Sequence, residues 1–95
     1  MIDESRFRDR RTLRLFHGER VRRYPPDLAA RTQNKLKIVY AASRFDDLAI
    51  PPGNHLEALK GDRRGQWSIR INSQWCICFA WDGMRTLAIE VVDCH

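Results

Sequence analysis

Long apolar runs are missing from this 95-residue sequence. No stretch approaches the roughly 18 consecutive apolar residues that a membrane-spanning helix requires. The N-terminal sequence, MIDESRFRDRR, has no apolar run behind its charges, so it lacks the pattern of a secretory signal. We therefore expect a protein that stays in the cytoplasm, with no membrane contact. At this length, a single domain over residues 1–95 is expected.

Cysteine is also scarce. The chain has three, Cys76, Cys78 and Cys94, and an odd number without an export signal favours reduced thiols over disulfide bonds. Zinc-site spacing is absent, because Cys94 and His95 are adjacent and neighbouring residues of a strand point to opposite faces. The sequence also lacks a nucleotide-binding glycine loop and a Ser-His-Asp order. We expect neither a metal site nor a cofactor.

Acidic residues are few in the N-terminal third. Residues 1–35 hold ten of the 17 lysines and arginines but five of the 12 acidic residues, whereas the rest of the chain is balanced. A basic surface attracts polyanions through phosphate contacts and counterion release. The expected partner is therefore nucleic acid or an acidic protein segment. Charge alone leaves open a second interpretation, a helix face that is merely solvated.

The first half of the sequence has helical periodicity. Residues 2–7 are compatible with a short strand, and residues 9–18 predict a short helix that ends near Gly18. Pro25 and Pro26 predict the start of a second helix, because proline is tolerated in a first turn. Its apolar positions recur at helical spacing to about Ser43. The following sequence, RFDDLAIPPGN, predicts a short helical turn and then a loop.

The second half alternates with the period of a β-strand. Three strands with one buried face each are expected, and their apolar positions are Trp67, Ile69 and Ile71; Trp75, Ile77, Phe79 and Trp81; and Leu87, Ile89 and Val91. Asp82-Gly83 predicts the turn between the second and third.

The register follows because the apolar residues must share a face. It pairs Ile71 with Trp75, Ile69 with Ile77 and Trp67 with Phe79, with a loop at residues 72–74. The opposite face then places Arg70 across from Cys76 and Ser68 across from Cys78, with Glu90 or Val92 completing the row. A further strand is expected at about residues 56–60. The predicted fold class is α+β, with N-terminal helices packed on one face of an antiparallel β-sheet.

Charged residues gather beside this sheet in a combination that suits RNA cleavage. Attack of a 2'-hydroxyl on the adjacent phosphate requires a base, cations for the developing charge and an acid for the leaving oxygen. Glu57 or His95 is a candidate base, and Lys60, Arg63 and Arg70 are candidate cations. Trp67 or Trp75 could stack a base of the RNA, although Trp67 suits the core better. The alternative is a salt-bridged hairpin in which these cations pair with Glu57 and Asp62.

Several motifs resemble one known family. The segments LEALKGDRRGQWSIRINSQW, CICFAW and IEVVDCH resemble the killer-protein, HigB-type branch of the RelE/ParE toxin superfamily, and the similarity covers nearly the whole chain. The resemblance implies a RelE-like fold and a toxin encoded beside a helix-turn-helix antitoxin of the HigA type. It also implies mRNA cleavage on the ribosome at the A site, without a small-molecule cofactor.

The resemblance can be followed residue by residue. Lys60, Arg63, Asp93 and His95 match the family pattern, and Glu57 stands where several members have histidine. The predicted catalytic residues are Glu57, Lys60, Arg63, Arg70 and His95. The predicted RNA-binding residues are Arg64, Asn72, Gln74, Cys76 and Asp93.

Three positions depart from the family. Cys76 replaces an arginine held to contact the scissile phosphate, Cys94 replaces a tyrosine, and Ala80 stands where many members carry another arginine. A thiol is mostly uncharged near neutral pH and is a weak donor, so we expect cleavage to be weakened, with Arg70 as a partial substitute. The alternative is a non-catalytic binding module that acts on another target, as gyrase-directed relatives do, or mainly binds its antitoxin.

Overall fold

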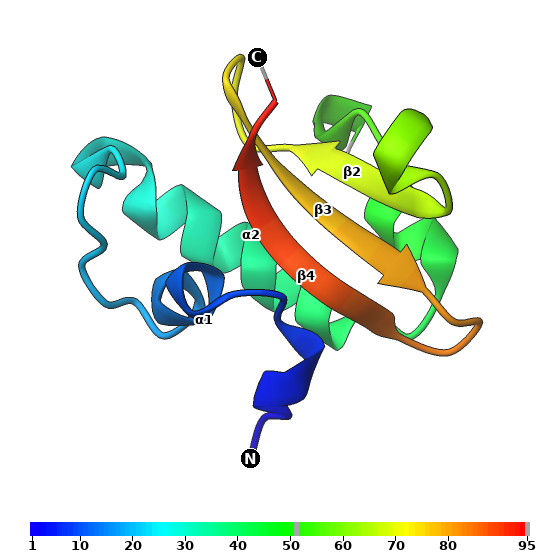
Figure 1. Ribbon diagram of the computed structural model, residues 1–95, viewed down its shortest axis with the longest axis horizontal. Helices are drawn as coiled ribbons and strands as arrows, with labels where there is room; N and C mark the ends of the chain where they lie inside the picture. Colours follow the sequence, from blue (N-terminus) through cyan, green and yellow to red (C-terminus); the bar gives the residue numbers. More distant parts are fainter. Residues whose placement is uncertain (51, 95) are drawn as a thin grey trace.

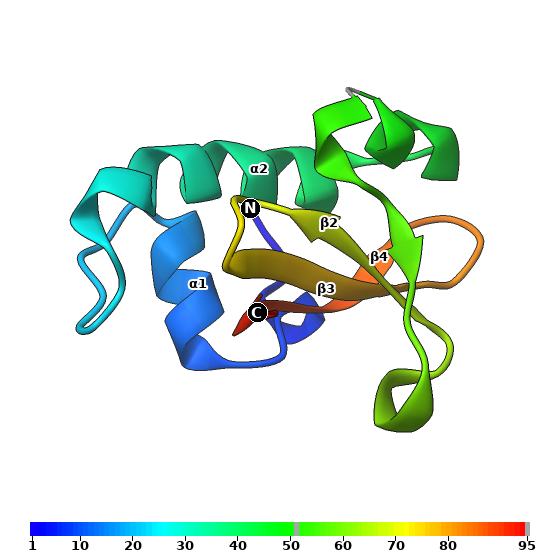
Figure 2. The same cartoon turned by 90° about the horizontal axis from the view of Figure 1, so that it is seen from above.

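Two helices pack against a four-stranded antiparallel sheet, one over a face and the other beside an edge, in the computed structural model, which describes residues 1–50 and 52–94 (Figures 1 and 2). The strands follow one another in the order β1-β2-β3-β4. The helices are α1 (Arg10–Phe16) and α2 (Ala29–Ala41), and the strands are β1 (Glu57–Ala58), β2 (Gln66–Arg70), β3 (Trp75–Trp81) and β4 (Thr86–Asp93). Short 3-10 turns are η1 (Glu4–Arg6), η2 (Pro26–Leu28), η3 (Phe45–Ala49), η4 (Pro52–Asn54) and η5 (Gly61–Arg63). The predicted α+β class is confirmed.

The two helices form for local reasons. The Asp9 carboxylate accepts a hydrogen bond from the Thr12 backbone N–H at 2.8 Å and so caps the first turn of α1. Pro26 opens η2, which leads directly into α2. Leu36 and Val39 of α2 are fully buried against the sheet. Both predicted helices are therefore confirmed, with α2 ending two residues before Ser43.

The register between β2 and β3 is the predicted one. Trp67 pairs with Phe79 and Ile69 with Ile77, so the apolar rows meet on the helix-covered face. The intervening loop is stabilised by the Asn72 side chain, whose Oδ1 accepts hydrogen bonds from the backbone N–H groups of Gln74 and Trp75. On the other face, the paired residues are Arg70 and Cys76, Ser68 and Cys78, Cys78 and Glu90, and Cys76 and Val92.

Leu87, an apolar residue of β4, lies on the opposite face of the sheet from the one predicted. Leu87 pairs with Ala80, and Glu90 pairs with Cys78, so the register shifts between these two rungs. The extra residue lies next to Ala88, whose φ of 51° is unusual for a residue with a side chain. This β-bulge reverses the alternation, so that Thr86, rather than Leu87, faces α2 and is fully buried.

The N-terminal segment is not the predicted strand. The side chain of Asp3 accepts a hydrogen bond from the Ser5 backbone N–H and starts η1. Phe7 then makes a single parallel bridge to Ile89. The turn at Asp82-Gly83 is present and spans residues 82–85, with Asp82 Oδ1 accepting hydrogen bonds from the backbone N–H groups of Met84 and Arg85. None of the helices in the described ranges is long and apolar enough to cross a lipid bilayer.

The residues after η1 cover the open edge of β4. The Arg8 backbone N–H donates to the Ile89 carbonyl at 2.8 Å, and the Val91 backbone N–H donates to Thr12 Oγ1 at 2.9 Å. Thr12 is completely buried. One hydroxyl of α1 therefore satisfies a strand N–H that would otherwise lack a partner, and the N-terminal segment shields the edge from pairing with another chain.

Replacing Thr12 by valine tests this contact. The variant keeps the shape of the side chain but leaves the Val91 N–H without its acceptor, so we expect the free energy of unfolding to fall by about 1 to 3 kcal/mol. Urea denaturation would measure it. Thr12→Ser, which retains the hydroxyl, should lose less. Equal stability of Thr12→Val and the wild type would mean that the bond adds nothing to folding.

Candidate functional site

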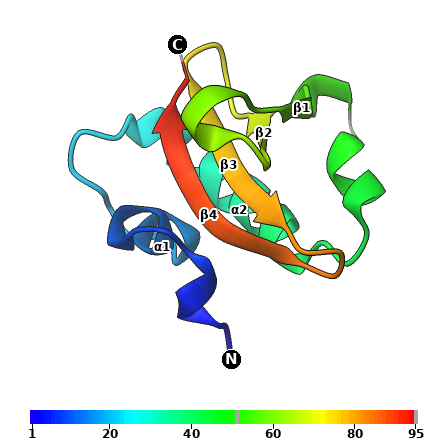
Figure 3. The same ribbon diagram turned by 45° about the vertical axis from the view of Figure 1, so that its right-hand side comes forward.

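A small hollow lies on the sheet face opposite α2. Its volume is about 170 Å³, and its lining residues are His55, Glu57, Leu59, Ser68, Arg70, Cys76 and Cys94. Strand pairing explains why they meet: Glu57 lies across from Ser68 on β1 and β2, and Arg70 lies across from Cys76 on β2 and β3. The predicted extra strand is present but shorter, because β1 contains two residues. The chain between β1 and β2 projects on this same side of the sheet (Figures 2 and 3).

Arg63 attaches that projecting segment to the sheet. Its guanidinium donates to Glu90 at 2.9 Å and to Gln66 Oε1 at 3.1 Å, and the bond to Glu90 raises the pKa of Arg63 above its usual value. Arg8 approaches the same Glu90 oxygen at 3.5 Å. Arg63 therefore pairs with an acid on β4. The salt-bridged alternative had predicted pairing with Glu57 or Asp62 instead. It holds η5 against the sheet, outside the lining of the hollow.

The other predicted cations are available. Lys60, Arg64 and Arg70 are exposed, and within the described part of the chain none has a carboxylate at ion-pair distance. Arg70 lines the hollow, whereas Lys60 and Arg64 flank η5. Glu57, the predicted base, is exposed on β1 and lies in the same hollow as Arg70. The structure thus brings one carboxylate and one guanidinium to a shared surface.

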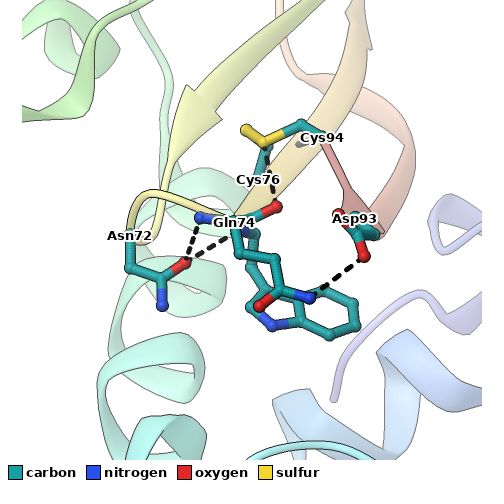
Figure 4. Close-up of a disulfide and its surroundings, with 6 residues drawn as sticks. Asn72, Gln74, Cys76, Asp93 and Cys94 are labelled. Atoms are coloured by element: carbon teal, nitrogen blue, oxygen red, sulfur yellow. Dashed lines mark hydrogen bonds between the residues drawn. A yellow bond between two sulfur atoms is a disulfide. The ribbon is translucent and has the colours of Figure 1, made fainter.

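The predicted RNA contacts at the β2–β3 loop are partly engaged within the protein. Gln74 Nε2 donates to Asp93 Oδ2 at 3.1 Å (Figure 4). Asn72 uses its side-chain oxygen in the turn itself. The Gln74 side chain therefore lies beside Asp93, the last residue of β4, which precedes Cys94. His95, the second candidate base, lies outside the described residues.

Two of the three cysteines are not reduced thiols. Cys76 and Cys94 form a disulfide with their Cα atoms 5.8 Å apart (Figure 4), while Cys78 is a free, buried thiol. The prediction of three reduced thiols is therefore wrong for this pair. A signal was present in the register: Val92 lies across from Cys76, so the residue two positions further on the same face is its diagonal neighbour. Counting cysteines missed it because an odd number does not exclude one bond.

The two candidate stacking tryptophans pack with the core, Trp75 buried and Trp67 partly buried. Trp75 is 8% exposed and packs edge-on against Tyr24, with 4.9 Å between ring centroids. Arg11 covers the Trp75 ring at 5.2 Å. Trp67 packs against Phe45 at 4.7 Å, in agreement with its expected place in the core. Stacking of an RNA base on Trp75 is excluded by this burial.

A four-stranded antiparallel sheet packed against two helices is an α+β arrangement consistent with the RelE-like fold. Residues 5–95 match the family described as RelE-like toxin of type II toxin-antitoxin system HigB. The chain belongs to this family.

Two curated proteins are similar to this chain. Toxin HigB-1 of Vibrio cholerae serotype O1 is 42% identical over 67 residues, which cover 70% of each chain. An uncharacterised protein of Haemophilus influenzae is 32% identical over 82 residues, which cover 85% of this chain and 81% of that protein. The family resemblance drawn from the motifs is confirmed, and membership in a type II toxin family implies an antitoxin partner.

Proposed function

We propose that this toxin is a ribosome-dependent endoribonuclease that cleaves mRNA and thereby inhibits translation in the cytoplasm. The observation that carries the proposal is the hollow lined by both Glu57 and Arg70, on the face of the sheet opposite α2. Its partner would be a helix-turn-helix antitoxin of the HigA type. Family membership supports the reaction class, and the hollow contributes a carboxylate and a guanidinium that suit it.

In the proposed reaction, separate side chains transfer the proton and stabilise the charge on the phosphate. Glu57 takes the proton from the 2'-hydroxyl as it attacks the adjacent phosphate. Arg70, fixed at the end of β2, stabilises the charge that develops on the phosphate oxygens. Lys60 adds a second cation from the segment beside β1. His95 is the remaining predicted proton-exchanging residue, placed next to Cys94 by the sequence alone.

Arg63 takes a different part in this scheme from the one expected. A guanidinium bonded to Glu90 can contact phosphate only by exchanging one anion for the other. Its role is therefore to position η5, and with it Lys60 and Arg64, beside the hollow. Arg64, Asn72, Gln74 and Asp93 remain predicted RNA contacts at the rim, whereas the Cys76 sulfur has no proton to donate while it is in the disulfide.

One observation favours a second function. The position at which the family resemblance implies an arginine is occupied by Cys76, whose sulfur is in a disulfide, so one expected cation is missing from the hollow. A chain that kept the scaffold and lost cleavage would act as a binding module for its antitoxin or for another target. The experiment that tests the nuclease also separates these functions.

The test is to map the 5' ends of a translated message in a purified ribosome system. We expect cuts at a fixed position relative to the A-site codon, and roughly ten-fold or more fewer cuts with Lys60→Ala, because it removes a cation from the phosphate site. Lys37→Ala is the matched control, since Lys37 is exposed on α2, on the other face of the sheet. Translation arrest without any cut would favour the binding module.

A further inference from the structure

The disulfide joins the end of β4 to β3, beside hydrogen bonds that link β4 to the β2–β3 loop. Cys76 and Cys94 both line the hollow, and Cys94 is the residue that follows the last position of β4. The Cys94 backbone N–H donates to the Gln74 carbonyl at 2.8 Å. The covalent bond therefore ties the end of an edge strand to β3, in the wall of the candidate site.

The three cysteines differ sharply in access. Cys94 is exposed, so a small molecule can reach its sulfur. Cys78 is 2% exposed, and burial raises the pKa of its thiol, so little reactive thiolate forms there. Cys76 is 7% exposed and already faces Cys94. Exchange with a disulfide in solution should therefore begin at Cys94 and end at Cys76, without involving Cys78.

We propose that Cys76 and Cys94 form a thiol–disulfide exchange site whose oxidised form orders the end of β4 and the wall of the hollow. The reactant is a low-molecular-weight disulfide or its thiol. The effect on RNA cleavage rests on the proposed function; the exchange and the ordering do not.

Oxidation of the pair takes place in two exchange steps. The Cys94 thiolate attacks one sulfur of the external disulfide, forming a mixed disulfide and releasing one thiolate. The Cys76 thiolate then attacks the Cys94 sulfur, which forms the internal bond and releases the second thiolate. The two cysteines lose two electrons and two protons, and the two released thiols take them up. An excess of external thiol reverses both steps.

Reduction changes the wall because two thiols cannot remain at bonding distance. The Cys94 side chain must rotate away from Cys76, and Cys94 is then held only by non-covalent contacts at the end of an edge strand. Strand ends of this kind open readily. We expect the reduced hollow to lose a fixed wall next to Arg70, whereas β3 in the middle of the sheet stays ordered.

The first experiment follows the exchange itself. The purified protein is equilibrated with mixtures of reduced and oxidised glutathione, free thiols are alkylated, and the alkylated cysteines are located by peptide mass spectrometry. We expect Cys76 and Cys94 to change together while Cys78 stays reduced. A pair that never oxidises, or three cysteines that react alike, would overturn the site.

The second experiment measures order without using RNA. Amide hydrogen exchange of the Cys94 N–H should be at least ten-fold faster in the reduced protein, and that of Ile77 in β3 should be unchanged. Cys94→Ser should match the reduced form under all conditions, and Cys78→Ala should respond like the wild type. Equal exchange of the Cys94 N–H in both redox forms would contradict the ordering.

The third experiment links the site to activity. We expect the oxidised protein to cleave ribosome-bound mRNA about ten-fold faster than the reduced protein, because the wall beside Arg70 is fixed. Cys94→Ser should cleave slowly whatever the glutathione ratio. Equal or faster cleavage by the reduced form would refute this link. If neither form cleaves, the proposed function is wrong, and the two preceding experiments alone decide on the exchange site.

Discussion

Replacing Arg70 by alanine is expected to lower the rate of mRNA cleavage by about 100- to 1000-fold, the usual cost of one preorganised donor to transition-state charge. Arg70 ends β2, lines the hollow that contains Glu57, and lies across from Cys76. Relatives are expected to carry an arginine at that neighbouring position. Because Cys76 supplies no charge, Arg70 should provide most of the electrostatic stabilisation of the transition state.

Single-turnover cleavage of a ribosome-bound message would measure this effect. Arg70→Lys should lie between alanine and the wild type, since it keeps the charge but loses the two-pronged donor geometry of guanidinium. Arg85→Ala is the matched control: Arg85 is an exposed arginine in the β3–β4 turn, where it pairs with Asp82. If Arg70→Ala retains the rate within about three-fold, the hollow does not bind the scissile phosphate.

The Arg70 substitutions should leave the folding of the protein unaffected. Arg70 is exposed, and no ion pair in the described ranges includes it. Surface substitutions of this kind usually change the free energy of unfolding by no more than about 0.5 kcal/mol. Equal thermal midpoints for Arg70→Ala and the wild type would therefore assign a loss of cleavage to the site itself.

The central sheet could be predicted because a strong physical constraint acts on it. A shift of one residue would expose every apolar side chain of a strand, so the alternation of Trp67, Ile69 and Ile77 permits one register. That register placed Arg70 and Cys76 side by side, as the structure confirms. The part of the site that lies within β2 and β3 was thus accessible from the sequence.

Features that depend on long-range contacts could not be predicted in the same way. The acid that pairs with Arg63 is Glu90, 27 residues away, because η5 folds toward the sheet. Local spacing suggested Glu57 or Asp62 instead. The bulge at Ala88 broke the period on which the position of Leu87 depended, and nothing in the alternation marked it. Both errors arise where tertiary packing overrides a local pattern.

Arg6 is a third residue whose surroundings the local pattern does not reveal. From the sequence alone it counts toward the basic surface of the N-terminal third. It is 8% exposed. Its Nε donates to the Thr86 carbonyl at 2.8 Å, and its Nη2 donates to the Tyr40 carbonyl and to Thr86 Oγ1 at 3.0 and 2.9 Å. The guanidinium carbon also lies 4.0 Å from the centre of the Tyr40 ring. Among the described residues no carboxylate lies at ion-pair distance from Arg6, so carbonyl oxygens and an aromatic face supply the close contacts to this buried charge.

We expect Arg6→Met to lower the free energy of unfolding by about 3 kcal/mol, because hydrogen bonds to a charged group each contribute ~1.5 to 3 kcal/mol and are not additive. In a chain of 95 residues this corresponds to a fall in thermal midpoint of roughly 12 to 24 °C. The methionine retains an apolar stem of similar length, so the loss reports on the guanidinium contacts. These contacts join η1 to α2 and to the start of β4, and their loss should also loosen the N-terminal cover of that strand.

Thermal and urea denaturation of Arg6→Met would be compared with Arg10→Met, in which an exposed arginine of α1 undergoes the same chemical change. Arg10→Met should stay within about 0.5 kcal/mol of the wild type. Arg6→Lys should recover only part of the loss, because an ammonium group cannot reproduce the planar fork that reaches Thr86 and Tyr40 together. A stable Arg6→Met protein would show that removing the buried charge offsets the lost hydrogen bonds, as happens when some buried ion pairs are replaced by apolar residues.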